Sequence, residues 1–123
     1  MNDTDKIKQA IINFVKGGDT RDVKLLNKVL HDDFRVTNNG FMGTSGVTII
    51  NKADYLSKIK SGVFGGLPRK MKILALDQSC IIASVKLQIE SSENDFLSYN
   101  SLVLDTDNQW KIINNLAIIK AKI

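Results

Sequence analysis

The sequence has one cysteine, one histidine and one proline. A single cysteine excludes a disulfide within the chain, and with a single histidine it excludes a zinc site of ordinary Cys/His composition. We therefore expect neither a metal ion nor another cofactor. Cys80 opens the apolar run "CIIASVKLQI", which predicts a small hydrophobic core residue rather than a reactive thiol.

Long hydrophobic runs are also lacking. No apolar stretch approaches the roughly 20 residues that cross a bilayer, so we expect no membrane partner. The first residues, "MNDTDKIKQ", are polar, without the basic and apolar regions of a signal peptide, which favours a cytoplasmic protein. Hydrophobic content of 43% and charged content of 24% are typical of a globular chain. A length of 123 residues fits one domain over 1–123.

The positive charge is not concentrated. The net charge is +4, and the densest basic stretch, residues 58–72, is interrupted by "SGVFGGLP". A nucleic-acid surface needs clustered Lys and Arg with aromatic residues on one face. We therefore expect no nucleic-acid partner, and we interpret "GVFGG" as a lid or connection near a pocket entrance, since it lacks the Lys-Ser/Thr of a phosphate loop.

The first half of the chain predicts three helices. Apolar residues recur at helical spacing over 7–15, and "GGD" at 17–19 predicts the end of that helix. A second apolar stripe follows over 23–30. Asn51 is a suitable N-cap for a third helix over 52–62.

The stretch "HDD" holds the only histidine beside two aspartates, His31, Asp32 and Asp33. A histidine next to carboxylates suggests acid–base chemistry. Its position after an apolar helical stripe instead predicts the exposed end of the second helix, where a protonated histidine is favoured by the helix dipole. We interpret the cluster as a polar elbow leading into a short strand, "FRVTN".

After Pro68 the hydrophobic pattern changes to period two. Strands are predicted over 70–76, 80–90, 96–106 and 109–123, the last two joined by a tight turn at "DN". Helices followed by antiparallel strands indicate an α+β fold, with three N-terminal helices packed on a strongly curved, mostly antiparallel sheet.

The order of these elements, with "GD" between two helices, "DDF.V" entering a strand and the closing pattern "LVLDTDNQWKII", resembles the nuclear transport factor 2-like superfamily. The chain looks most similar to its lumazine-binding and polyketide-cyclase-like (SnoaL-like) branches. The resemblance covers essentially the whole chain and implies a cystatin-like cone that encloses a pocket, often in a homodimer. Members include isomerases, cyclases, dehydratases and non-catalytic binding proteins, so the fold does not choose among these functions.

Comparison with ketosteroid isomerase, an enzyme of this superfamily, argues against acid–base catalysis. That enzyme uses a pocket aspartate as base, and a tyrosine with a protonated aspartate as oxyanion donors. The resemblance puts the base at Asn38, the second acid at Asn100 and the tyrosine at Ile11 or Phe14. An amide does not accept a proton near neutral pH. We therefore assign no catalytic residue.

The predicted turn at Asp107-Asn108 sets the pairing of the last hairpin. It places Asn100 opposite Asn115 and Leu102 opposite Ile113, and opposed residues share a face. With two aromatic residues from the helices, this face predicts a partly apolar, amide-lined pocket, built from Phe14, Asn38, Tyr55, Ser98, Asn100, Ile113 and Asn115. The alternative is that these amides satisfy strand ends or face solvent at an open rim.

The other face of the hairpin is more apolar. Tyr99, Val103, Trp110 and Ile112 form a predicted homodimer interface, because aromatic residues concentrate in interface cores. In the alternative, Trp110 packs beneath the C-terminal segment "IIKAKI".

These patterns favour a domain that binds a small neutral or heteroaromatic ligand. Two alternatives stay open: an isomerase, dehydratase or cyclase that uses Asp33 or Tyr55, and a protein-interaction module that uses the sheet face. An ionisable carboxylate in a closed cavity would favour the enzyme, and a cavity lined by amides would favour binding.

Overall fold

A computed structural model describes residues 2–122, apart from the side chain of Met42. Its elements in chain order are α1 (Asp3–Asp19), α2 (Val23–Val29), β1 (Leu30–Asn39), η1 (Phe41–Gly43), β2 (Val47–Asn51), α3 (Lys52–Lys60), β3 (Lys70–Ser79), β4 (Ile82–Glu90), β5 (Asn94–Leu104) and β6 (Trp110–Ala121). The six strands form one sheet in the order β2-β1-β6-β5-β4-β3, antiparallel except for the β1/β6 pair. The predicted α+β class is confirmed.

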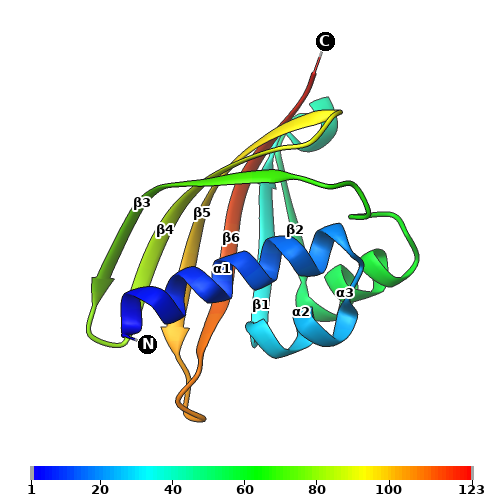
Figure 1. Ribbon diagram of the computed structural model, residues 1–123. Coiled ribbons are helices and arrows are strands. Elements are labelled where there is room, and N and C mark those ends of the chain that lie inside the picture. The colour runs from blue at the N-terminus through cyan, green and yellow to red at the C-terminus, as the bar shows by residue number, and fades with distance from the viewer. Residues whose placement is uncertain (1, 123) are drawn as a thin grey trace.

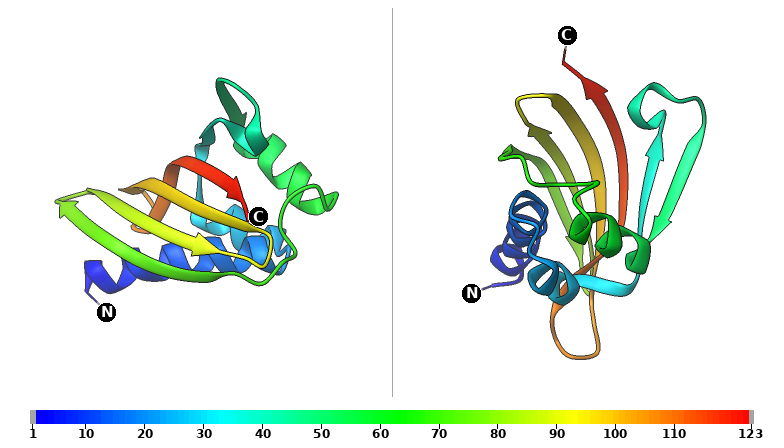
Figure 2. Two further views of the ribbon diagram at one scale, coloured as in Figure 1. Left: turned by 90° about the horizontal axis from the view of Figure 1, so that it is seen from above. Right: turned by 90° about the vertical axis from the view of Figure 1, so that its right-hand side faces the viewer.

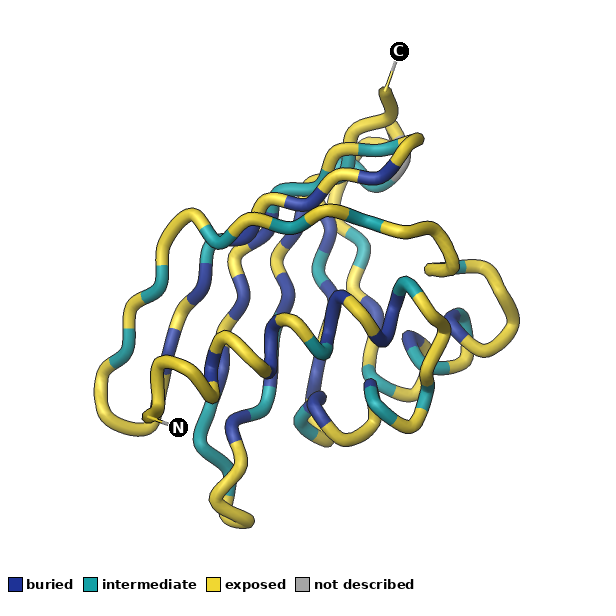
Figure 3. The backbone as a smooth tube through the Cα atoms, viewed as in Figure 1, coloured by how far each residue is buried: buried dark blue, intermediate teal, exposed yellow. Residues whose placement is uncertain are grey.

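The helices cover one face of this curved sheet. Helix α1 lies across the sheet, and α2 and α3 lie beside the end formed by β1 and β2 (Figures 1 and 2). We call the side that α1 covers the helix-covered face, and the opposite side the open face. Buried and exposed residues alternate along the strands (Figure 3), as expected when one face packs against helices and the other is exposed. Among residues 2–122, no helix is long and apolar enough to cross a membrane.

Helix α1 contains the predicted apolar stripe and ends later than predicted. The side chain of Asn2 caps it by accepting a hydrogen bond from the backbone N–H of Asp5 at 2.9 Å. The helix then continues through Gly17 and Gly18 to Asp19. A Cβ atom on Gly17 would lie 2.7 Å from Cγ of Leu26. The glycine is therefore needed for close packing of α2 on α1, not to end the helix.

The polar elbow is part of a strand. Strand β1 begins at Leu30, so 31–33 lie in β1 and not at the end of a helix. Nδ1 of His31 accepts a hydrogen bond from the backbone N–H of Asp33. The side chain that binds the end of α2 is instead Lys52, whose Nζ donates to the backbone carbonyls of Asn27 and Leu30. The helix-dipole interpretation of His31 is wrong because α2 is one residue shorter than its apolar stripe.

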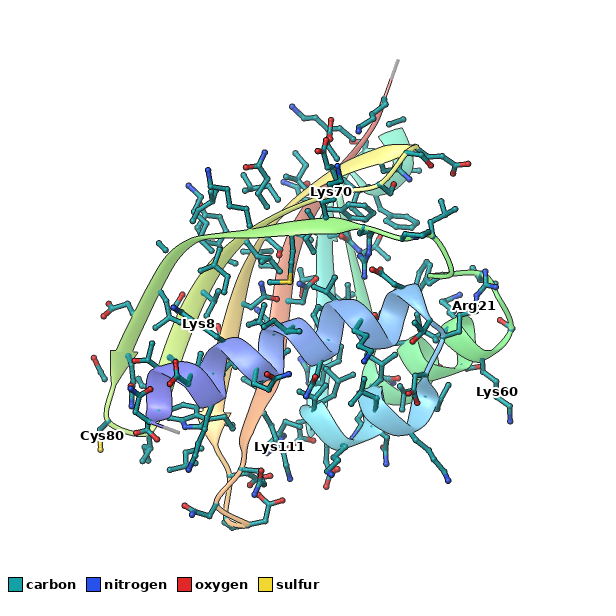
Figure 4. The ribbon with its side chains drawn as sticks, viewed as in Figure 1. Lys8, Arg21, Lys60, Lys70, Cys80 and Lys111 are labelled. Atoms are coloured by element: carbon teal, nitrogen blue, oxygen red, sulfur yellow. The ribbon has the colours of Figure 1, made fainter. Side chains whose placement is uncertain are left out.

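Cys80 is exposed, contrary to the prediction of a core position. It lies in the turn between β3 and β4 with a φ of +54°, and β4 begins only at Ile82. The prediction from the apolar run is wrong because its first two residues, Cys80 and Ile81, form the turn between β3 and β4. Figure 4 shows Cys80 at the end of the molecule remote from Arg21.

The last hairpin contains a bulge that the sequence did not reveal. Asn100 faces Asn115 as predicted, but the register shifts after Ser101, so that Leu102 faces Ile112. The connection spans residues 105–109 rather than a two-residue turn, and the extra residue in β6 restores the pairing further along.

This bulge reverses the predicted faces near the turn. Trp110 and Ile112 lie on the helix-covered face, with exposed fractions of 5% and 0%. Nε1 of Trp110 donates to the carboxylate of Asp3 on α1. These two residues are therefore core residues and not part of a dimer interface, and Ile113 does not reach the predicted pocket.

Candidate ligand-binding site

A cavity of about 490 Å³ lies on the helix-covered face, near the C-terminal end of α1. Its walls come from α1, α3, β1, η1, the three strands β4 to β6 and the 61–69 loop. Cavities of roughly 300–1,000 Å³ accommodate small organic ligands. Five predicted residues line it: Phe14, Asn38, Tyr55, Ser98 and Asn115.

Aromatic side chains form one wall. Tyr55 lies between the other rings, with centroids 6.2 Å from Phe14 and 6.2 Å from Phe64. Phe64 meets Phe41 edge to face at 5.9 Å, and Phe34 supports Tyr55 from behind in the same manner at 5.6 Å. Such offset and edge-to-face contacts are the favoured geometries of aromatic pairs. The wall therefore offers a rigid apolar surface to a flat ligand.

Polar side chains form the floor where β1, β6 and β5 lie side by side. Asn100 donates through Nδ2 to Oγ of Ser98 at 3.0 Å and to the backbone carbonyl of Val85 at 3.4 Å. Its Oδ1 accepts from Nδ2 of Asn115 at 2.6 Å. Asn100 is fully buried and does not itself line the cavity. It supports the two side chains that do.

Asn38 contributes an unsatisfied hydrogen-bond acceptor. The residue is 2% exposed, and its Oδ1 has no hydrogen-bond partner among the described residues. Leaving a buried polar group unpaired costs about 1–3 kcal/mol. Asn38 also lines the cavity, and a ligand donor that reached this oxygen would satisfy it.

The phenol of Tyr55 is protonated at neutral pH. Burial raises its pKa to about 12, and the nearby cation of Arg69 opposes that shift only in part. A protonated phenol is a hydrogen-bond donor and not a base.

Arg69 and Asp19 form a half-buried ion pair at the rim. The backbone N–H of Arg69 donates to Oδ2 of Asp19 at 3.1 Å, and its Nε donates to Oδ1. The guanidinium also lies over the ring of Phe96, 5.3 Å from the centroid. Glu93 lines the cavity as well, from the exposed turn between β4 and β5. The charged groups are thus at the mouth, and the amides are at the floor.

The 61–69 loop closes one side of the cavity. The sequence analysis interpreted "GVFGG" in this loop as a lid or connection near a pocket entrance. Arg21 holds this loop through hydrogen bonds to the carbonyls of Gly62, Phe64 and Gly65. The backbone N–H of Gly66 donates to the carbonyl of Gly18, and a Cβ atom on Gly65 would clash with that oxygen at 2.2 Å. Glycine is required there so that loop and helix can meet.

Sequence reasoning missed the loop aromatic Phe64, the η1 residue Phe41 and the ion pair of Asp19 with Arg69. The residues of that pair are 50 positions apart, and no local pattern joins them. The run "GVFGGLPR" was the available signal, because several glycines beside apolar residues allow close contact with a helix.

Of the two candidates for an enzyme, Tyr55 lines the cavity and Asp33 does not. The carboxylate of Asp33 is 87% exposed, in β1. No group of three or more His, Cys, Asp or Glu residues in the described part of the chain could hold a metal ion. Asp105 and Asp107 bind Lys111 at the exposed hairpin turn, and these contacts lower the pKa of both carboxyls.

Comparison with known proteins identifies the family. The model of the family described as "Putative lumazine-binding" matches residues 2–116. No curated protein matches the chain.

Many solved structures share the fold. An NTF2-like protein of unknown function from Shewanella baltica superposes with a TM-score of 0.82 at 15% identity, over 97% of this chain and 94% of that one. An NTF2-like protein from Cytophaga hutchinsonii gives 0.79 at 20% identity, over 99% and 100%. A ketosteroid isomerase-like protein from Erwinia carotovora atroseptica gives 0.78 at 14% identity, over 99% and 100%. The chain shares the fold of these NTF2-like structures, and it belongs to the "Putative lumazine-binding" family.

Proposed function

We propose that this domain binds a small, flat, uncharged ligand in the cavity, without acid–base catalysis. The observation that carries the proposal is Oδ1 of Asn38, a buried acceptor without a partner among the described residues, on a residue that lines an aromatic-walled cavity. A ligand N–H or O–H that reached this oxygen would satisfy it, and the rings of Phe14 and Tyr55 would contact the ligand's flat surface.

An uncharged ligand fits the distribution of charge. The floor consists of amide and hydroxyl side chains, which cannot neutralise a buried ion. At the rim, the guanidinium of Arg69 is already paired with Asp19. An ionised group that entered the cavity would lose its hydration without gaining a free counter-charge. The family name supports the same class of ligand, because it describes the binding of a heteroaromatic compound.

Binding is favoured over proton-transfer catalysis. Proton abstraction needs a base within hydrogen-bond reach of the substrate. The floor offers Asn38, Ser98 and Asn115, none of which is a base near neutral pH. The lining carboxylate Glu93 is not on the floor but on the exposed turn between β4 and β5. Tyr55 is held protonated by burial, with a pKa of about 12, so it can donate a hydrogen bond but cannot abstract a proton at pH 7.

Native mass spectrometry of the purified protein tests this proposal, because it detects any co-purified ligand. We expect a bound small molecule in wild type and at least tenfold lower occupancy in Asn38→Leu, a loss of about 1.4 kcal/mol from one hydrogen bond and its desolvated acceptor. The same substitution should raise the free energy of unfolding of the ligand-free protein by about 1 kcal/mol, since the unpaired oxygen is removed.

Asn39→Leu is the matched control, because Asn39 is the next residue of β1 and is exposed. It should leave the occupancy unchanged. Equal ligand occupancy in wild type and Asn38→Leu would contradict the proposal, as would a ligand that stays bound when the cavity is blocked by Ala117→Phe.

A further inference from the structure

A directional chain of hydrogen bonds runs beneath the cavity floor. It starts at the backbone carbonyl of Val85, which accepts from Nδ2 of Asn100. The same nitrogen donates to Oγ of Ser98, and Oδ1 of Asn100 accepts from Asn115. Val85 contributes a backbone carbonyl of β4, and Ser98 and Asn115 line the cavity.

The direction of this chain is fixed by its first member. A backbone carbonyl can only accept, so the amide nitrogen of Asn100, and not its oxygen, must face Val85. A reversed amide would point its oxygen at the carbonyl of Val85 and its N–H groups at the amide nitrogen of Asn115. Asn100 has no exposed surface, so water cannot compensate for either mismatch.

The fixed direction determines what the cavity floor presents. Asn115 uses one of its two amide N–H groups on Asn100, and this orientation leaves its carbonyl oxygen as an acceptor for the cavity. Oγ of Ser98 accepts from Asn100, which leaves its hydroxyl proton as a donor. An acceptor and a donor therefore stand together on the floor, and the acceptor of Asn38 lies on the neighbouring strand β1, diagonal to Asn115 in the register.

This acceptor and donor are diagonal neighbours on two paired strands, because Ser98 faces Ala117 and Asn100 faces Asn115. A cyclic amide in a ligand carries an N–H donor beside a C=O acceptor. It would donate its N–H to the carbonyl oxygen of Asn115 and accept the hydroxyl proton of Ser98.

We propose that the cavity selects an aromatic cyclic amide with a free N–H, and that Asn100 is a positioning residue that sets this preference without touching the ligand. The inference rests on the proposed binding function and specifies its ligand class. Asn100 acts by holding Asn115 and Ser98 in one orientation. Without it, the amide of Asn115 could rotate and present its N–H groups instead.

A set of three probes tests the ligand class. The binding of 2-quinolone, N-methyl-2-quinolone and naphthalene is titrated by the chemical shifts of ¹⁵N-labelled protein. The first two differ only at the N–H, and the third has no polar group. We expect 2-quinolone to bind at least tenfold more tightly than either of the others, because only it satisfies the floor acceptors.

Single substitutions distinguish a positioning role of Asn100 from a general loss of structure. Asn100→Leu should reduce the preference for 2-quinolone over its N-methyl derivative to about onefold. Ser98→Ala should weaken both quinolones alike and keep the preference, because both retain the carbonyl. Ser101→Ala, at an exposed position of β5, is the matched control and should change neither affinity. If Asn100→Leu does not fold, Asn115→Leu should abolish the same preference.

The outcomes distinguish the two proposals. Equal binding of 2-quinolone and its N-methyl derivative to wild type would overturn the ligand class and leave small-molecule binding standing. A folded Asn100→Leu variant with an unchanged preference would overturn the positioning role. Failure of all three probes to shift any cavity resonance at their solubility limits would overturn both this inference and the proposed function.

Discussion

The phenol of Tyr55, in the cavity wall, makes the stability of the folded protein depend on pH. Burial raises the pKa of its phenol to about 12, against about 10 in an unfolded chain. The folded state therefore holds the proton more tightly. The resulting stability is fully present below pH 10, and it is lost as the pH rises from 10 towards 12.

We expect wild type to lose about 1.4 kcal/mol of unfolding free energy between pH 9 and 11 relative to Tyr55→Phe. The phenylalanine variant keeps the ring packing and every other titratable group, so the difference isolates the phenol. Urea unfolding of both proteins at pH 9, 10 and 11 measures it. Parallel pH profiles for the two proteins would show that the phenol is not buried as described.

At the scale of elements, the close contact between α1 and α2 requires a glycine at position 17 of α1. Gly17 lies in α1, where alanine is ordinarily favoured by about 1 kcal/mol. A Cβ atom there would meet Cγ and Cδ2 of Leu26 at 2.7 and 2.8 Å, and Leu26 is fully buried. Packing therefore opposes helix propensity at this position.

We expect Gly17→Ala to lower the free energy of unfolding by about 1–3 kcal/mol despite its better helix propensity, because overpacking costs that much. Thermal and chemical denaturation measure the change. Gly18→Ala is the matched control, since its Cβ would come too close only to the end of the Arg69 side chain and would lie at an ordinary contact distance of 3.8 Å from the Tyr55 hydroxyl. That variant should stay within about 1 kcal/mol of wild type. An increase in stability for Gly17→Ala would refute the packing argument.

At the scale of the whole molecule, the open face of the sheet carries an apolar strip. One rung joins Ile49, Thr37, Leu116 and Tyr99 across four strands, and opposed residues share a face. Ile49, Leu116 and Tyr99 are 61%, 44% and 49% exposed. Val103 lies on the same face and is half-buried. Patches of this kind mark interaction surfaces.

We propose that a second copy of the chain covers this strip. A twofold contact needs only a self-complementary surface, and the strip presents the same apolar residues to its own copy. Compared with the sequence prediction, Tyr99 and Val103 remain candidates, while Trp110 and Ile112 are replaced by Leu116 and Ile49. A different protein partner is the alternative occupant.

Sedimentation equilibrium tests the dimer. We expect wild type to have twice the 13.7 kDa mass of the chain, and Leu116→Lys to be monomeric because a lysine would be desolvated in the contact. Ile12→Lys is the matched control: Ile12 is exposed to a similar extent, 42%, but on α1. A monomeric wild type at about 50–100 micromolar would contradict the dimer and favour a different protein partner for the strip.

The sequence by itself determined the order and kind of the three α-helices and of strands β1 and β3 to β6, but not of strand β2 or the short helix η1. Apolar residues at helical spacing, the N-cap at Asn51 and the period-two strands are local signals, and the structure bears them out. These signals were predictable because neighbouring residues in the chain create them. Asn100 faces Asn115 as predicted, but only because the extra residue in β6 offsets a connection longer than the predicted turn.

Only the tertiary structure decided which face the residues near the last turn occupy and what completes the cavity. The bulge in β6 turns Trp110 and Ile112 inward because burying both against α1 is worth more than an unbroken ladder. The pair of Asp19 and Arg69 forms because the loop glycines bring distant segments together. The unpartnered oxygen of Asn38 depends on packing from several elements, so no sequence pattern could have shown it.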